Sequence, residues 1–230
     1  MASNVCLREL ILTTENEAIS ATHVRNHEIA HFRAVHQGLA FLFMISGTAA
    51  LIYQVCWQRL LFEGFGVDIE SVTIVVSTFM LGLGLGALAG GEIADRFPDR
   101  VIPMFAMIEL ATAAFGVCSP YLIRTISAAT VNGSLATIAA VNFGLLLIPT
   151  TLMGATLPIL VTHVVHRYRN LGVSVGVLYF ANTLGGAFGA GFTGFVALYH
   201  FGLTSTIYIA AALNAAVGAT VWFALRPRDV

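Results

Sequence analysis

The chain has 230 residues, of which 57% are hydrophobic and 10% are charged, and its mean hydropathy is +0.85. A water-soluble domain of this size needs more polar surface than this composition supplies, so the composition excludes that class and predicts a protein that lies mostly in lipid. The net charge is −1, and all eleven basic residues are arginines. Without a basic face or a polybasic cluster, we expect no nucleic-acid partner.

The first 36 residues contain the pattern His27-Glu28-Ile29-Ala30-His31, which fits the zinc-peptidase motif of two histidines and a general base. No surrounding domain supplies a cleft, so we favour an amphipathic helix at the membrane surface and predict no metal site. Adventitious metal or haem contact, or docking to a partner, stays open. Cys6, Cys56 and Cys118 lack metal-ligand spacing, and we expect free thiols.

Apolar runs long enough to cross a membrane follow from residue 37 onward. A bilayer core of about 30 Å needs about 20 apolar residues of helix. Five clear runs cover residues 38–61, 72–93, 101–123, 171–198 and 204–225. A further run, 134–165, contains Pro149 and Pro158, which should kink it. We interpret it as one bent crossing, with two short crossings as the alternative.

These runs predict an all-α integral membrane bundle of six helices with both ends in the cytoplasm. The expected organisation is a cytoplasmic segment at 1–36, a six-span membrane domain at 37–226 and a short cytoplasmic tail at 227–230. Basic residues in short loops are retained in the cytoplasm. With the N-terminus inside, the outer side receives only Arg59 and Arg124, and the cytoplasmic side receives Arg25, Arg33, Arg96, Arg100, Arg167, Arg169, Arg226 and Arg228.

Small residues recur on two of the expected spans at the spacing that lets helix backbones approach closely in lipid. They are Gly82, Gly86 and Gly90 on the second span, and Gly185 and Gly189 on the fifth. The glycines of the second span superficially resemble a dinucleotide-binding loop, but no strand precedes them, and we expect no cofactor. We predict that both spans pack tightly against other helices.

Glu109 lies well inside the third expected span, about 12 Å from its beginning. An ionisable group at that depth marks a pathway, a relay or a buried partner. Simple depth arithmetic puts Asn142, Asn182 and Asn214 at similar levels on the fourth, fifth and sixth spans. We interpret the four as a candidate intramembrane polar layer, favouring interhelical hydrogen bonding over binding of a small cation or proton.

Near the outer end of the first span, Trp57 and Arg59 have the chemistry of interfacial anchors, one through its amphipathic ring and the other by snorkelling. An outer binding surface at these positions is the alternative.

The segment from Gly91 to Arg100 resembles the cytoplasmic loop signature of the major facilitator superfamily. Its matching residues are Gly91, Asp95, Arg96 and Arg100, whereas Pro98 and Asp99 depart from the pattern. The resemblance implies that six spans form half of that superfamily's twelve-helix transporter.

Three ordered segments, 46–61, 153–160 and 178–185, resemble the membrane region of bacterial spermidine synthase-like proteins, the fused facilitator and spermidine synthase proteins. In that family a methyltransferase-like domain follows the last span. Here the chain ends at Val230, so we expect the membrane region without the catalytic domain, and no aminopropyltransferase activity of its own.

The first functional hypothesis is a non-catalytic accessory, anchoring or scaffold subunit in a bacterial inner membrane. Its partners would be the lipid bilayer and another membrane or cytosolic chain, or a second copy of itself. The alternative is a transporter of small solutes or cations, polyamines included, that works as a dimer of six-helix halves. An enzyme in its own right ranks third, and no catalytic, cofactor-binding or metal residue is predicted.

Overall fold

The computed structural model describes residues 37–64, 68–130, 133–168 and 171–224. The expected amphipathic surface helix, the His27–His31 motif, Cys6 and the tail lie outside these ranges. The chain divides into two units, Met1–Leu39 and Ala40–Val230. The arrangement described below is that of the second unit.

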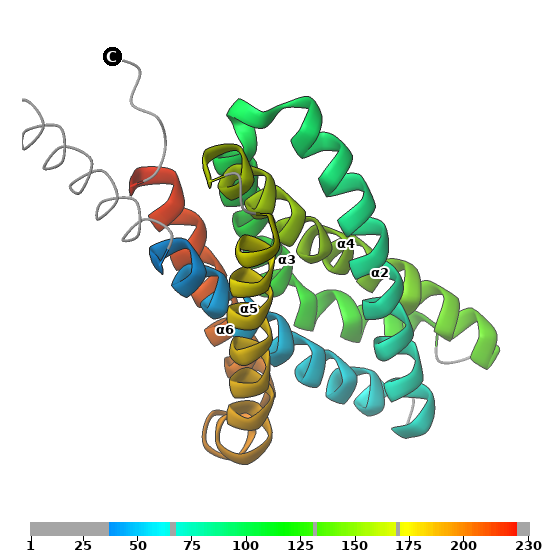
Figure 1. The fold of residues 1–230 in the computed structure, drawn as a ribbon. Helices are drawn as coiled ribbons and strands as arrows, with labels where there is room; N and C mark the ends of the chain where they lie inside the picture. Colours follow the sequence, from blue (N-terminus) through cyan, green and yellow to red (C-terminus); the bar gives the residue numbers. More distant parts are fainter. Residues whose placement is uncertain (1–36, 65–67, 131–132, 169–170, 225–230) are drawn as a thin grey trace, which may run out of the picture. The chain divides into compact units, whose positions relative to one another are not determined.

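Every element within the described ranges is helical (Figure 1). The first helix covers Gln37–Gly64 and is drawn in blue and cyan. The others are α2 (Asp68–Arg96), the short 3-10 helix η1 (Pro98–Arg100), α3 (Val101–Thr130), α4 (Leu135–Tyr168), α5 (Leu171–Phe192), the π-helix η2 (Thr193–Ala197) and α6 (Leu198–Ala224).

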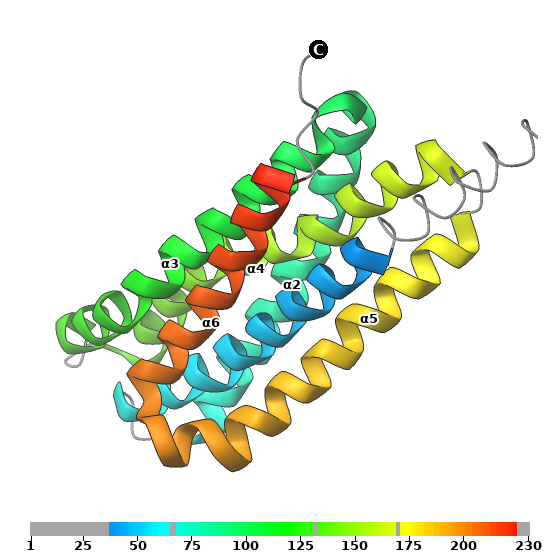
Figure 2. The same cartoon turned by 90° about the vertical axis from the view of Figure 1, so that its left-hand side faces the viewer.

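Within the described ranges, five helical stretches are long and apolar enough to cross a membrane. The fifth covers 50 residues, Val175–Ala224, because two of the expected spans form one apolar helical stretch. Inside it Gly202 adopts φ 74° and ψ 174°, which is not helical. The chain reverses direction between α5 and α6 (Figure 2). Gly202 therefore lies in the gap that the sequence predicts between the spans 171–198 and 204–225.

The proline-containing run forms one helix, α4, with Pro149 and Pro158 inside it. The alternative of two short crossings is therefore wrong for this segment. Proline is tolerated in membrane helices because nearby hydroxyl groups and local adjustments compensate the lost backbone bond. Threonines near both prolines donate within the same helix, Thr150 to the Leu146 carbonyl at 2.8 Å and Thr156 to the Met153 carbonyl at 2.6 Å, although neither carbonyl is the one four residues before its proline.

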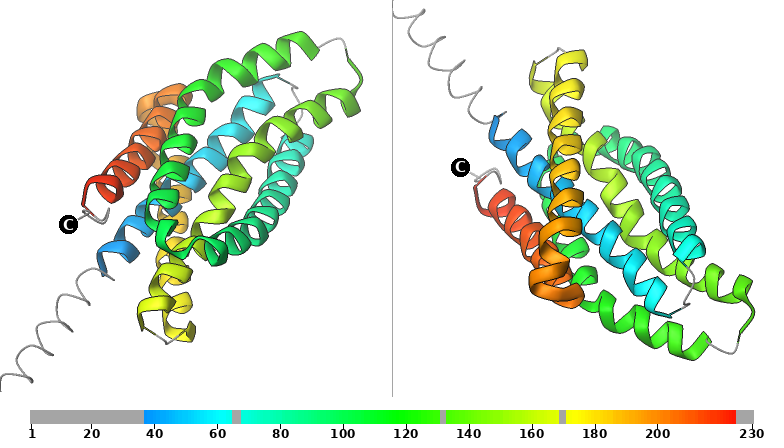
Figure 3. Two further views of the ribbon diagram at one scale, coloured as in Figure 1. Left: turned by 90° about the horizontal axis from the view of Figure 1, so that it is seen from above. Right: turned by 90° about the horizontal axis from the view of Figure 1, so that it is seen from below.

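From Ala40 onward the first helix lies among the other helices (Figure 3). One face contributes a run of fully buried side chains to the core: Ala49, Ile52, Tyr53, Cys56, Trp57, Leu60 and Leu61. Conversely, large apolar side chains are exposed elsewhere, among them Phe195 at 88% and Tyr199 at 85%. Such an outer surface fits contact with lipid.

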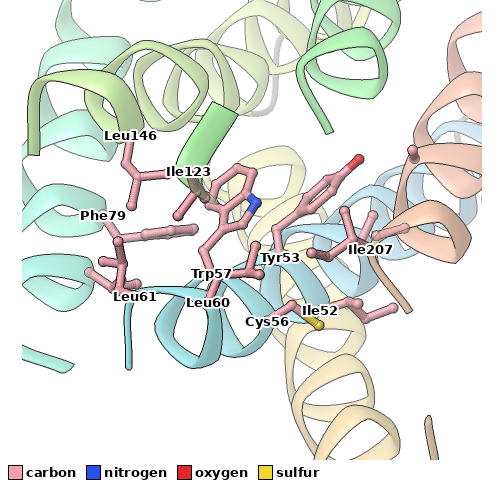
Figure 4. Close-up of a cluster of buried hydrophobic side chains, with 14 of the residues drawn as sticks. Ile52, Tyr53, Cys56, Trp57, Leu60, Leu61, Phe79, Ile123, Leu146 and Ile207 are labelled. Carbon is pink, nitrogen blue, oxygen red and sulfur yellow. The ribbon is translucent and has the colours of Figure 1, made fainter. Parts of the chain in front are cut away.

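Trp57 lies at the centre of this core (Figure 4). Its ring stacks on Tyr53 with centroids 4.9 Å apart, and its Nε1–H donates to Ser119 Oγ at 2.9 Å. The prediction that Trp57 anchors the protein at the membrane interface is therefore wrong, since the side chain is 0% exposed. Arg59, two residues later, is exposed.

The glycine-rich faces lie against other helices. Gly82, Gly86 and Gly90 of α2 contact Thr150, Thr151 and Ala155 of α4 so closely that a methyl group at any of them would collide. Gly185 and Gly189 of α5 contact Met44 and Thr48 of the first helix in the same way. The Thr48 hydroxyl also donates to the Gly185 carbonyl at 3.0 Å. The α2–α4 pair is visible in Figure 3.

Candidate functional site

A cavity of about 220 Å³ lies where the first helix and α2, α3, α4, α5 and α6 meet, and each of them contributes to its wall. The polar part of the wall consists of Ser46, Glu109, Thr112, Thr156, Tyr179, Asn182 and Asn214. The apolar part includes Phe43, Leu83, Met153 and Leu157. We call this space the Glu109 cavity.

Glu109 is the acidic side chain of this wall. The residue is 2% exposed, and Ser46 Oγ–H donates to its Oε1 atom across 2.6 Å. Its Oε2 atom is buried and has no hydrogen-bond partner among the described residues. None of the described residues that line the cavity is basic. A buried carboxylate without a counter-charge is costly, so the site favours an added proton or a cation.

Two further oxygens of the same wall are buried without a partner among the described residues. They are Thr112 Oγ1 and Asn214 Oδ1, and both residues are 2% exposed. Thr112 follows Glu109 by three positions in α3, a spacing that puts two side chains on one helix face. Asn214 approaches from α6. Three hydrogen-bond acceptors from two helices thus line one cavity.

The four residues of the expected polar layer do not all line the same cavity. Glu109, Asn182 and Asn214 line the cavity, with Asn182 half-buried and its Oδ1 atom close to Gly47. Asn142 does not line it, and its Nδ2–H donates to the Ile138 carbonyl at 2.9 Å in its own helix. The part of α4 at the cavity begins at Met153, about 16 Å farther along the helix.

Sequence reasoning missed Ser46 and Thr112. The position of Thr112 one turn from Glu109 is a signal that could have identified it. Nothing local distinguishes Ser46 from other small residues of the first helix, because its partner lies 63 positions away.

The loop signature lies at the end of α2 and in η1. Asp95, Arg96 and Arg100 are exposed, and Gly91 is half-buried. The backbone N–H of Arg100 donates to the Phe97 carbonyl at 3.0 Å, which closes the short turn. In the described ranges, no group of three His, Cys, Asp or Glu side chains is arranged to hold a metal ion, and Cys56 and Cys118 are free thiols.

Comparison with known proteins gives one similarity. Over 182 residues, 79% of this chain, the sequence is 26% identical to a polyamine aminopropyltransferase of Oceanobacillus iheyensis. The match covers 34% of that protein, so the chain spans about a third of the relative's length. No family model matches the sequence, and no solved structure matches it. The similarity supports the spermidine synthase-like resemblance for part of such a protein.

Proposed function

We propose that this chain is a non-catalytic membrane region of the spermidine synthase-like class, which anchors or scaffolds a partner protein at a bacterial inner membrane. The observation that carries the proposal is the similarity to a polyamine aminopropyltransferase, which covers 79% of this chain and 34% of the relative. The apolar helices and their close glycine contacts suit a stable platform in lipid.

The proposal includes six crossings with both ends in the cytoplasm, arranged as half of a facilitator fold. The reversal of the chain at the end of α5 supports a division of the long apolar stretch into two crossings. The distribution of arginines supports the orientation. In this arrangement Arg96 and Arg100 face the cytoplasm, where a cytosolic partner would dock.

Gentle-detergent purification from the native membrane, followed by native mass determination, tests the anchoring role. We expect a foreign chain to copurify in a fixed ratio and to carry aminopropyltransferase activity. Replacement of Arg96 and Arg100 by Glu should release it, because both exposed cations lie at the proposed docking end. The matched control is Arg59→Glu. Arg59 is exposed and lies near the end of the first helix that the proposed topology places on the outer side, so this variant should retain the partner.

Recovery of the chain without any foreign protein would contradict the anchoring role. So would a partner that stays bound to the variant with both replacements.

One observation favours a second function, transport of a small cation, polyamines included, by a dimer. It is the buried Glu109 carboxyl in a cavity to which all six described long helices contribute. Recovery as a homodimer, with spermidine uptake into proteoliposomes, would move this function to first place. Failure of a verified homodimer to transport spermidine would exclude it for that substrate.

A further inference from the structure

We propose that the Glu109 cavity binds a small primary alkylammonium ion. Its ammonium group would lie at Glu109, Thr112 and Asn214, and its alkyl chain would lie along the apolar part of the wall. This inference goes beyond the anchoring role and does not depend on it.

The hydrogen-bonding chemistry of the cavity calls for a donor-rich ligand. Glu109 Oε2, Thr112 Oγ1 and Asn214 Oδ1 are all buried oxygens without a partner among the described residues. Buried polar atoms in folded proteins are usually hydrogen-bonded. An ammonium group carries three N–H donors and no acceptor, so one group could satisfy all three oxygens.

The charge of the cavity calls for a cation. Glu109 supplies an acidic group, and among the described residues the lining includes no arginine or histidine to neutralise it. A proton on the carboxyl would remove the charge but would add only one donor, whose hydrogen bond would pair Glu109 Oε2 with one of the other two oxygens and leave the third without a partner. A neutral alcohol or amide would not compensate the charge at all. The ammonium ion provides both the charge and the donors.

The apolar part of the wall distinguishes an alkylammonium ion from a bare metal ion. Hard cations such as Ca²⁺ take about six to eight oxygen ligands, whereas Phe43, Leu83 and Met153 occupy much of this wall. Such side chains suit a short hydrocarbon chain. A cavity of about 150 Å³ can hold benzene. The 220 Å³ available here therefore accommodates a chain of a few carbons beside the ammonium group.

The test is calorimetric titration of the purified full chain in lipid nanodiscs with n-butylammonium chloride, with n-butanol and sodium chloride as comparison ligands. We expect butylammonium to bind, and we expect the affinities for butanol and sodium to be lower by a factor of about ten or more. Glu109→Gln keeps the shape of the side chain and removes its charge, so it should weaken butylammonium binding about tenfold or more. The matched control is Glu92→Gln on the exposed face of α2, which should leave binding unchanged.

Equal binding of butanol and butylammonium would overturn the proposal, as would unchanged binding to Glu109→Gln or no binding to the wild-type chain. If Glu109→Gln does not fold, Thr112→Val replaces it as the test, because it removes one acceptor and nearly preserves the volume. A folded Thr112→Val variant should bind butylammonium several-fold more weakly, and unchanged affinity there would also overturn the proposal. Copurification of a partner is a separate measurement, so the anchoring role can fail or hold independently.

Discussion

At the scale of single residues, the Trp57 ring shows how the first helix is held against α3. Its indole N–H needs a partner once it is buried, and Ser119 provides that partner. Ser119 in turn donates to the Gly116 carbonyl at 2.9 Å. The Tyr53 hydroxyl lies so close to Gly116 that a methyl group there would collide with it. The stacked Tyr53 and Trp57 rings therefore pack against one turn of α3, Gly116 to Ser119.

Trp57→Ala should destabilise the protein by about 3–5 kcal/mol, because it removes a fully buried ring and leaves a cavity that the surrounding helices only partly fill. The midpoint of detergent-induced unfolding, followed by circular dichroism, measures the loss. The control is Phe195→Ala, which removes an aromatic ring that is 88% exposed and should change the midpoint little. Similar midpoints for the two variants would contradict the central position of Trp57.

At the scale of elements, the contact between α2 and α4 depends on the absence of side chains at particular positions. Gly86 lies against the Thr151 carbonyl and Gly154 of α4, whereas Gly84 of the same helix has open space around it. Hydrocarbon burial does not drive helix association in lipid, so van der Waals packing of the two backbones stabilises the pair.

Gly86→Ala should therefore destabilise the bundle by about 1–3 kcal/mol, the usual range for overpacking a close contact. Gly84→Ala adds the same methyl group to the same helix without a collision, so it should be neutral or slightly stabilising. Unfolding midpoints of the two variants give the comparison. If the two substitutions had the same effect, the close approach of α2 to α4 would not be needed for stability.

The turn before the main part of α6 depends on Gly202. Its φ of 74° with ψ of 174° is a backbone conformation that is essentially restricted to glycine. Gly202→Ala should cost about 1–3 kcal/mol for that reason. Gly194→Ala in η2 is the control, because that glycine has open space around it and no positive φ. Unchanged unfolding of Gly202→Ala would show that the turn tolerates another conformation.

The helices could be predicted from the sequence more readily than the site, because apolar length is a local property. The run at 101–123 lies inside α3, and the gap after residue 198 contains the non-helical Gly202. The cavity depends instead on how helices are aligned against one another. Asn142 was assigned to the level of Glu109 by counting from a span end, but α4 extends over 34 residues and presents Met153 there. Likewise, the burial of Trp57 depends on contacts with other helices, with Phe115 and Ser119 of α3 and with Phe79 of α2.

At the scale of the whole molecule, charged groups gather near the helix ends. Arg124 of α3 lies 3.5 Å from Glu63 of the first helix and 3.4 Å from the Thr204 hydroxyl of α6. Both charged side chains are 51% exposed, so this pair contributes little stability. Near the other end of α3, η1 carries exposed Asp99 and Arg100. Six crossings would put these two groups on opposite sides of the membrane.

Cysteine labelling tests that arrangement. In a background with Cys6 and Cys118 replaced by Ser, Cys56 remains as a thiol that is 0% exposed and should not react. Asp99→Cys then probes η1, and Phe201→Cys probes an exposed position beside the turn at Gly202. With six crossings and the N-terminus inside, a membrane-impermeant maleimide should label Phe201→Cys in intact cells, and Asp99→Cys only after permeabilisation. The opposite pattern would invert the orientation. Failure to label Phe201→Cys under either condition would mean that the 50-residue apolar stretch does not emerge from the membrane at its turn.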